Sequence, residues 1–183
     1  MSDEQLVKDC IQKKSSAQKA LFDKFSGRMY GICLRYASDS QEAQDIMQDG
    51  FIKVFKALDG FHHDGSLEGW IKRIMINTAL DAYRKEKKRR YAVELDDEKA
   101  MEISEQDGIV EGLSAEYLLK IINQLPEGYK VVFNMFAIEG YSHKEIALEL
   151  GISVNTSKSQ YSRARTYLQK MLSKSETNWT NER

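Results

Sequence analysis

The sequence predicts an all-α protein with two small helical domains joined by an acidic flexible linker. Apolar residues recur at three- and four-residue spacing through most of the chain, which is the period of an amphipathic helix. The 183 residues include a single proline, and few clusters of turn-forming residues interrupt this pattern. Residues 93–115, by contrast, are acidic and show no sustained apolar period, which is typical of an extended, self-repelling linker.

Charge is distributed unevenly along the chain. The net charge of −1 by itself argues against a nucleic-acid partner. Residues 66–92, however, hold eight Lys or Arg against three Asp or Glu, and residues 117–174 hold eight against four. Residues 93–116 hold nine acidic residues against Lys99 alone. We therefore expect an N-terminal domain at 1–92, the linker at 93–115, a C-terminal domain at 116–174 and a polar tail at 175–183.

The composition predicts a cytoplasmic protein. Hydrophobic residues make up 42% of the chain and charged residues 30%, as in soluble globular proteins. No run of about 18 apolar residues is present to span a membrane, and the polar N-terminus lacks the apolar core of a signal peptide. Cys10 and Cys33 are far apart and form no metal-ligand pattern, so reduced thiols are expected.

The first domain should contain several helices. One apolar face runs from Leu21 to Tyr36. A second helix should open at Asp39, whose spacing to Glu42 suits a capping box. Ser66 can cap a third helix, which is apolar nearly all round in its first part and should be buried there.

The helix that opens at Asp39 has two different faces. Its apolar face comprises Met47, Phe51, Val54, Phe55 and Leu58. A separate, mostly polar face comprises Asp45, Gln48, Asp49, Ile52 and Lys56. An exposed Ile within a polar stripe often marks a protein contact, although an incidental surface Ile explains the pattern equally well.

The third helix carries a polar stripe that continues into a run of cations: Arg73, Asn77, Asp81, Arg84, Lys85, Lys87, Lys88, Arg89 and Arg90. This pattern is equally typical of a phosphate-binding track and of a solvated helix end. Near its start lie rings that can stack on unpaired bases, namely Phe61, His62, His63 and Trp70, although Trp70 could equally belong to the core. The adjacent histidines have no further ligand nearby, so no metal site is expected.

Residues 140–165 predict a helix-turn-helix. Ser142 and Glu145 have capping-box spacing, and Gly151 stands where the first helix should end with a positive φ. Ser153 or Asn155 can cap the second helix. Its inward positions are Ser157, Tyr161, Ala164 and Leu168, and its outward positions are Asn155, Thr156, Lys158, Ser159, Gln160, Ser162, Arg163 and Arg165.

The outward side chains of this second helix are short and polar or cationic, which suits base edges and phosphates. DNA binding is therefore the favoured interpretation, with an ordinary helical hairpin as the alternative. No nucleophile–base pair, catalytic carboxylate pair or cofactor loop stands out, so we expect neither catalysis nor a cofactor.

The order of these parts resembles that of bacterial RNA polymerase sigma factors of the extracytoplasmic-function (ECF) type, within the sigma-70 family, over nearly the whole chain. The family's polymerase-binding helix is matched by Asp45, Ile46, Gln48, Asp49, Phe51 and Lys53. Its promoter-melting segment is matched by Trp70, Arg73, Ile74, Asn77, Ala79 and Asp81. Residues 125–165 resemble its C-terminal promoter-binding domain.

The resemblance implies that the chain binds core RNA polymerase (the β′ coiled coil and the β flap) and promoter DNA, and many relatives also bind an anti-sigma factor. It implies polymerase binding by Asp45, Gln48, Asp49, Ile52, Lys53 and Lys56. It implies single-strand binding at the downstream element by Phe61, His62, His63, Ser66, Trp70, Arg73, Asn77, Arg84, Lys87 and Lys88. It implies duplex binding at the upstream element by Ser142, Asn155, Thr156, Lys158, Ser159, Gln160, Ser162, Arg163 and Arg165.

The chain departs from the family pattern in its second helix-turn-helix helix. The family's usual glycine, valine and cation are Asn155, Ser157 and Gln160 here. The change to Ser157 weakens a core contact, and the change to Gln160 alters what can be read on DNA. Two further functions compete with a sigma factor: a stand-alone helix-turn-helix regulator with a helical dimerisation domain, and a helical adaptor that binds only proteins.

Overall fold

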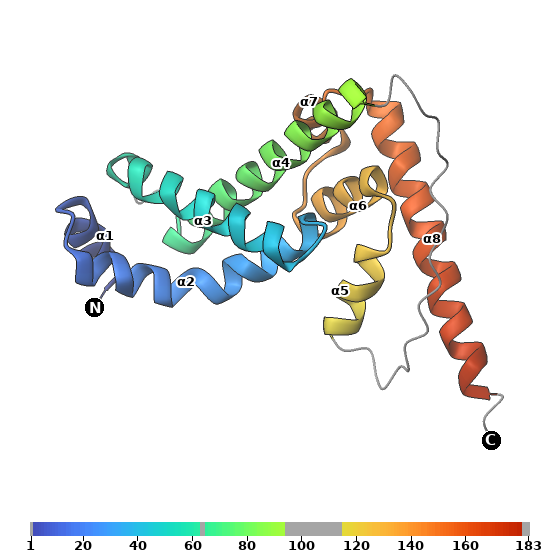
Figure 1. Cartoon of the computed structure of the whole chain (residues 1–183), viewed down its shortest axis with the longest axis horizontal. Helices are drawn as coiled ribbons and strands as arrows, with labels where there is room; N and C mark the ends of the chain where they lie inside the picture. Colours follow the sequence, from blue (N-terminus) through green and yellow to red (C-terminus); the bar gives the residue numbers. More distant parts are fainter. Residues whose placement is uncertain (1, 63–64, 94–114, 181–183) are drawn as a thin grey trace. The chain divides into compact units, whose positions relative to one another are not determined.

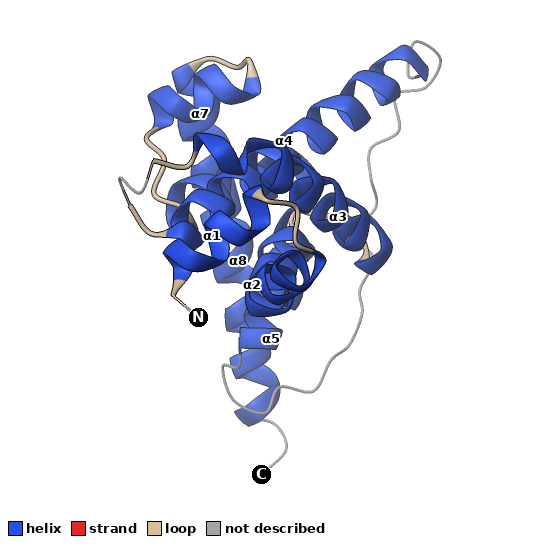
Figure 2. Ribbon diagram, turned by 90° about the vertical axis from the view of Figure 1, so that its left-hand side faces the viewer, coloured by secondary structure: helices blue, strands red, loops and turns tan. Residues whose placement is uncertain are grey.

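The computed structural model describes residues 2–62, 65–93 and 115–180. The predicted linker lies outside these residues except for its two end positions, and so does His63. The described residues form helices, turns and short connecting segments without any strand, which confirms the all-α prediction (Figure 2). The backbone divides into two compact units, Met1–Glu86 and Lys87–Arg183, which are described separately below.

The first unit consists of α1 (Asp3–Ile11), α2 (Ser15–Tyr36), α3 (Ser40–Ala57), the 3₁₀ turn η1 (Leu58–Gly60) and most of α4 (Leu67–Val93). Helix α1 packs on α2, and α2 lies beside α3 (Figure 1). Arg28 on α2 forms an ion pair of 2.5 Å with Glu68 on α4. The largest fully buried side chains of this unit are Val7, Leu21, Met29, Val54, Leu58, Ile71, Met75 and Leu80.

Helix α1 was not predicted from the sequence. The Oγ of Ser2 accepts a hydrogen bond from the backbone N–H of Gln5, which caps the helix start. Leu6, Val7 and Cys10 are buried, so a short amphipathic helix closes the end of the unit. A cap followed by apolar residues at this spacing was the available signal.

The start of α3 differs slightly from the predicted capping box. Asp39 caps the helix by accepting a hydrogen bond of 2.8 Å from the N–H of Glu42. The Glu42 carboxylate accepts from the backbone N–H of Ser38 at 2.6 Å, rather than from Asp39. Along the helix, the core face is centred nearer to Ile46, which is buried, than predicted, because Met47 and Phe55 are only half-buried.

Helix α4 begins as predicted, because the Oγ of Ser66 accepts a hydrogen bond of 3.0 Å from the N–H of Gly69. It is not apolar all round, however. Arg73 and Asn77 are exposed, whereas Ile71 and Met75 are fully buried. The polar stripe therefore faces solvent even in the part of the helix that packs in the core.

The second unit consists of α5 (Ala115–Asn123), α6 (Glu127–Phe133), the π-helical turn η3 (Asn134–Ile138), α7 (His143–Leu150) and α8 (Val154–Thr180). Helices α5, α6 and α7 each contact α8, and Figure 1 shows α5 and α6 beside it. The core of this unit comprises Ile121, Leu125, Val131, Val132, Met135, Ile146 and Ala164.

Pro126 is the N-cap of α6, and Gly128 lies within that helix. One sequence expectation about this unit is corrected. Helix α8 continues to Thr180, so residues 175–180 extend the helix rather than forming a separate tail. In the described ranges, no helix combines the length and the apolar character that a membrane crossing requires.

Candidate protein and DNA interfaces

Helix α3 presents a continuous exposed face. All six residues predicted to bind polymerase are exposed on it: Asp45, Gln48, Asp49, Ile52, Lys53 and Lys56. Ile52 is 50% exposed, which makes it a large apolar side chain surrounded by polar ones. Asp45 accepts a hydrogen bond of 3.2 Å from the side chain of Gln41, one turn earlier. A face of this kind can supply an apolar anchor with a polar rim.

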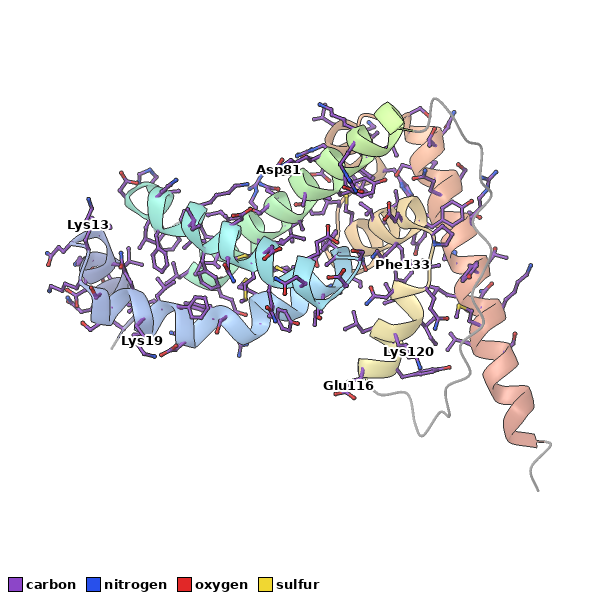
Figure 3. The ribbon with its side chains drawn as sticks, in the orientation of Figure 1. Lys13, Lys19, Asp81, Glu116, Lys120 and Phe133 are labelled. Atoms are coloured by element: carbon purple, nitrogen blue, oxygen red, sulfur yellow. The ribbon has the colours of Figure 1, made fainter. Side chains whose placement is uncertain are left out.

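Asp81, labelled in Figure 3, connects this face of α3 to the polar stripe of α4. One of its carboxylate oxygens lies 3.0 Å from Nζ of Lys53, and the other lies 2.6 Å from Nη2 of Arg84. Burial raises the pKa of Asp81, but the hydrogen bonds and charges of Arg84 and Lys53 outweigh this effect, so the net result is a lowered pKa. The carboxylate therefore stays ionised and orients two cations that were predicted to belong to different interfaces.

The aromatic residues near the start of α4 do not all face solvent. Phe61 is only 8% exposed, and its ring centroid lies 5.4 Å from that of Trp70, which is half-buried. Phe61 therefore belongs to the core here, contrary to its expected role in stacking on bases, because burying its ring against Trp70 removes apolar surface from water. His62 is exposed, and so is Ser66, although its hydroxyl caps α4.

The polar stripe of α4 offers several cationic and amide groups. Arg73, Asn77 and Lys88 are exposed, and Lys87 is half-buried. Arg84 is also half-buried and is held by Asp81. The stripe therefore provides donors along one side of the helix, interrupted by the carboxylate of Asp81.

Helix α7 and the first part of α8 form the helix-turn-helix predicted at residues 140–165. Both halves of the capping box are present, since Ser142 accepts from the N–H of Glu145, and the carboxylate of Glu145 accepts from the N–H of Ser142 at 2.7 Å. Gly151 ends α7 with a φ of 63°, in the left-handed region that favours glycine. Ser153, rather than Asn155, caps α8 by accepting a hydrogen bond of 2.9 Å from the N–H of Thr156.

The outward face of α8 is largely free for contact with a ligand. The exposed residues of this face are Asn155, Lys158, Ser159, Ser162, Arg163 and Arg165. Thr156 and Gln160 are partly covered. Thr156 exchanges a hydrogen bond of 2.8 Å with the hydroxyl of Ser153, and Gln160 lies against Gly128 of α6.

Arg163 lies at one edge of an open groove of about 280 Å³ between α6 and α8. Its Nη1 donates a hydrogen bond of 3.4 Å to the phenol oxygen of Tyr129. The lining contains hydroxyls, aromatic rings and cations but no carboxylate: Tyr129, Ser162, Arg163, Thr166, Tyr167 and Lys170. This lining suits a phosphate group better than it suits a cation.

Beneath the outward face of α8, four residues connect α7, α8 and η3, namely His143, Ser157, Phe136 and Tyr161. Nδ1 of His143 lies 2.9 Å from Oγ of Ser157, and its ring stacks on Phe136 with centroids 4.2 Å apart. The ring centroids of Tyr161 and Phe136 are 4.5 Å apart. Burial, and then the charge of Lys158, lower the pKa of His143. The sequence did not predict a functional role for His143, whose only sequence signal is its position next to the Ser142 cap.

Together, two helical units, one with an exposed mixed face and the other with a helix-turn-helix, are the architecture of a DNA-binding protein with a second exposed surface. Comparison with known families narrows this class. The family model for sigma-70 region 2 matches residues 21–89, and the model for sigma-70 region 4 matches residues 115–168. The two matches follow one another in the order predicted from the sequence.

Known proteins agree with these matches. The chain is 30% identical to RNA polymerase sigma-H factor of Pseudomonas aeruginosa over 181 residues, covering 93% of each chain. It is 26% identical to the ECF RNA polymerase sigma-E factor of Escherichia coli K12, covering 90% of this chain and 91% of that one. The chain therefore belongs to the sigma-70 family, as a sigma factor of the ECF type, and directs transcription initiation by RNA polymerase at promoters.

Solved structures share the fold. The sigma factor RpoE of Bartonella quintana, in complex with the anti-sigma factor NepR, has a TM-score of 0.52 at 23% identity, covering 85% of this chain and 96% of that one. CnrH in complex with the cytosolic domain of CnrY has a TM-score of 0.50 at 23% identity, covering 93% of this chain and 97% of that one. At this identity the likeness concerns the fold alone.

Proposed function

We propose that the exposed face of α3 is the surface by which this sigma factor binds core RNA polymerase, at the coiled coil of the β′ subunit. The observation that carries the proposal is Ile52, a half-exposed apolar side chain flanked by exposed Gln48 and Asp49. Burying one such anchor within a polar rim supplies affinity, and the surrounding carboxylates supply register and partner choice. The β flap is the second polymerase contact, made by the C-terminal unit.

Substitution of Asp49 by Arg tests this assignment. The change reverses one charge on an exposed helical position, so it should leave the fold intact and lower the affinity for sigma-free core polymerase by tenfold or more, since a like-charge contact costs several kcal/mol. Asp23→Arg on α2 is the matched control, because Asp23 is also an exposed helical carboxylate. Equal affinities for both variants and the wild type would remove α3 from the polymerase interface.

The stripe of α4 is the proposed contact for the opened downstream element. Arg73, Asn77, Lys87 and Lys88 supply donors to phosphates and bases, and Trp70 supplies a partly exposed ring at the start of the helix. Phe61 supports Trp70 from the core instead of stacking on a base. Opening the duplex exposes bases that only a single-strand binder can retain, so this surface stabilises the melted state.

The outward face of α8 is the proposed contact for the intact upstream element. Asn155, Lys158 and Ser159 occupy the first turns, which enter the major groove in a helix-turn-helix complex. Arg163 and the groove beside it contact the phosphate backbone. The altered positions Asn155, Ser157 and Gln160 give this protein its own promoter preference.

Two further features complete the proposal. The chain has no catalytic activity of its own and acts in the cytoplasm, where polymerase supplies the chemistry. An anti-sigma factor binds the chain and holds it inactive; in support, the similar sigma factor RpoE of Bartonella quintana was solved in complex with the anti-sigma factor NepR. A purified partner of this kind should inhibit promoter-specific transcription at one-to-one stoichiometry, and a partner that binds without inhibiting would contradict this role.

A further inference from the structure

A hydrogen-bonded pair joins α7 to α8 beneath the outward face of α8. His143 is the first residue of α7, and Ser157 lies in the first turns of α8. Their Nδ1 and Oγ atoms are 2.9 Å apart. Ser157 is 0% exposed, so its hydroxyl would be costly to leave without a partner. The imidazole provides that partner from across the helix interface.

The imidazole is itself held in place. It stacks almost parallel on Phe136, with an interplanar angle of 12°, and packs edge-on against Tyr161, with ring centroids 5.9 Å apart. Phe136 belongs to the π-helical turn η3, which leads directly into the helix-turn-helix. The position of Nδ1 is therefore set by a segment outside the two helices that it connects.

This pair constrains the orientation of α8 more closely than apolar packing does. A hydrogen bond is directional, whereas Ala164, the next fully buried contact two turns later, is small and apolar. Successive residues of a helix are rotated by about 100°, so Thr156 and Lys158 flank Ser157 on either side. Fixing Ser157 against α7 therefore fixes the direction in which both flanking side chains point.

We propose that His143 is a positioning residue for promoter recognition, which through Ser157 sets the rotation of α8 and so the upstream bases that this sigma factor prefers. The inference rests on the proposed binding of α8 to the upstream element. It assigns a specificity role to a side chain that need not touch DNA. Replacing Ser157 with the family's usual valine would exchange a directional contact for a nondirectional one.

The test uses the full chain bound to core polymerase and one promoter that this holoenzyme transcribes, with the upstream element either intact or scrambled. The measured quantity is the affinity for the promoter with the intact upstream element divided by the affinity for the promoter with the scrambled element. His143→Ala and Ser157→Val should each lower this ratio about tenfold, the discrimination that one good base contact provides, with little change in affinity for the scrambled promoter. Combining them should lower it no further, because both break the same bond.

Conservative variants separate positioning from folding. His143→Asn keeps a hydrogen-bonding atom near the place of Nδ1 and should recover part of the ratio. The double variant His143→Phe, Ser157→Val replaces the pair by apolar packing, so it should restore thermal stability without restoring the ratio. The inference would be overturned if the double variant recovered both thermal stability and the affinity ratio. It would also be overturned if both single variants left the ratio unchanged. A wild-type holoenzyme that does not distinguish the two promoters would instead refute the proposed function.

Discussion

Lys53 on α3 and Asp81 on α4 form an ion pair of 3.0 Å, and the same carboxylate holds Arg84. The pair joins the helix that we propose binds polymerase to the helix that we propose binds opened DNA. We propose that Asp81 competes with DNA phosphates for these two cations, and this competition can be measured.

Asp81→Asn should increase the affinity for single-stranded DNA and steepen its salt dependence, because Lys53 and Arg84 become available to phosphates. The free energy of unfolding should change by less than about 1 kcal/mol, since these ion pairs are exposed. Fluorescence anisotropy of a labelled oligonucleotide at several salt concentrations measures the first effect. Asp23→Asn, which removes an ion pair with Lys19 on α2, is the control. A weaker affinity of Asp81→Asn than of this control would show that Asp81 assists binding.

Gly50→Ala should destabilise the N-terminal unit. A Cβ atom at this position would lie 2.2 Å from Sδ of Met75, which is fully buried, so α3 and α4 could no longer approach as closely. Overpacking of this kind costs about 1–3 kcal/mol. Chemical denaturation measures the loss.

Gly27→Ala is the control for Gly50, because Gly27 lies in α2 and a Cβ there would have no neighbour within 4 Å. This variant should gain about 0.5–1 kcal/mol from helix propensity alone. Equal stabilisation of Gly50→Ala and Gly27→Ala would show that α3 and α4 do not approach closely at Gly50.

Arg163→Ala should weaken binding to duplex promoter DNA about equally for all upstream sequences. It removes one cation beside the groove, so the slope of log affinity against log salt should fall by about 1. The comparison is Lys120→Ala on α5, an exposed cation outside the groove. A change in sequence preference with an unchanged slope would place Arg163 on a base instead of a phosphate.

The stability of the C-terminal unit should depend on the protonation of His143. Burial and Lys158 lower the pKa of this imidazole in the folded state, so the unfolded chain binds a proton more readily. The contribution of His143 is therefore complete above a pH of about 6.5, the ordinary value, and is lost as the pH falls through the lowered folded-state pKa.

NMR titration of the His143 ring in the full chain measures this pKa directly. Lys158→Gln should raise it toward the ordinary value, because the repulsive charge is removed. Gln160→Lys, which adds a cation to the half-buried position two residues further along the same helix, tests whether the effect is specific to position 158. An unchanged pKa in Lys158→Gln would mean that burial alone lowers it.

Local sequence signals predicted the helix-turn-helix well because each acts over a few residues. The Ser142 capping box and the positive φ of Gly151 follow from backbone chemistry that a short segment specifies. The exposed face around Ile52 followed in the same way from helical periodicity.

Tertiary contacts decided the features that the sequence did not reveal. The burial of Phe61 depends on contact with Trp70. Lys53 forms an ion pair with Asp81, twenty-eight residues later, and the proposed role of His143 depends on its hydrogen bond with Ser157. None of these pairs is within one helical turn in the sequence, so periodicity could not detect them.

The central claim is that this chain directs core polymerase to promoters through α3 and α8. The most direct measurement is run-off transcription of genomic DNA by sigma-free core polymerase with the added chain, followed by mapping of transcript starts. We predict discrete starts preceded by a shared upstream motif, lost with Asp49→Arg and retained with Asp23→Arg. Starts identical to those of core polymerase alone would contradict the account.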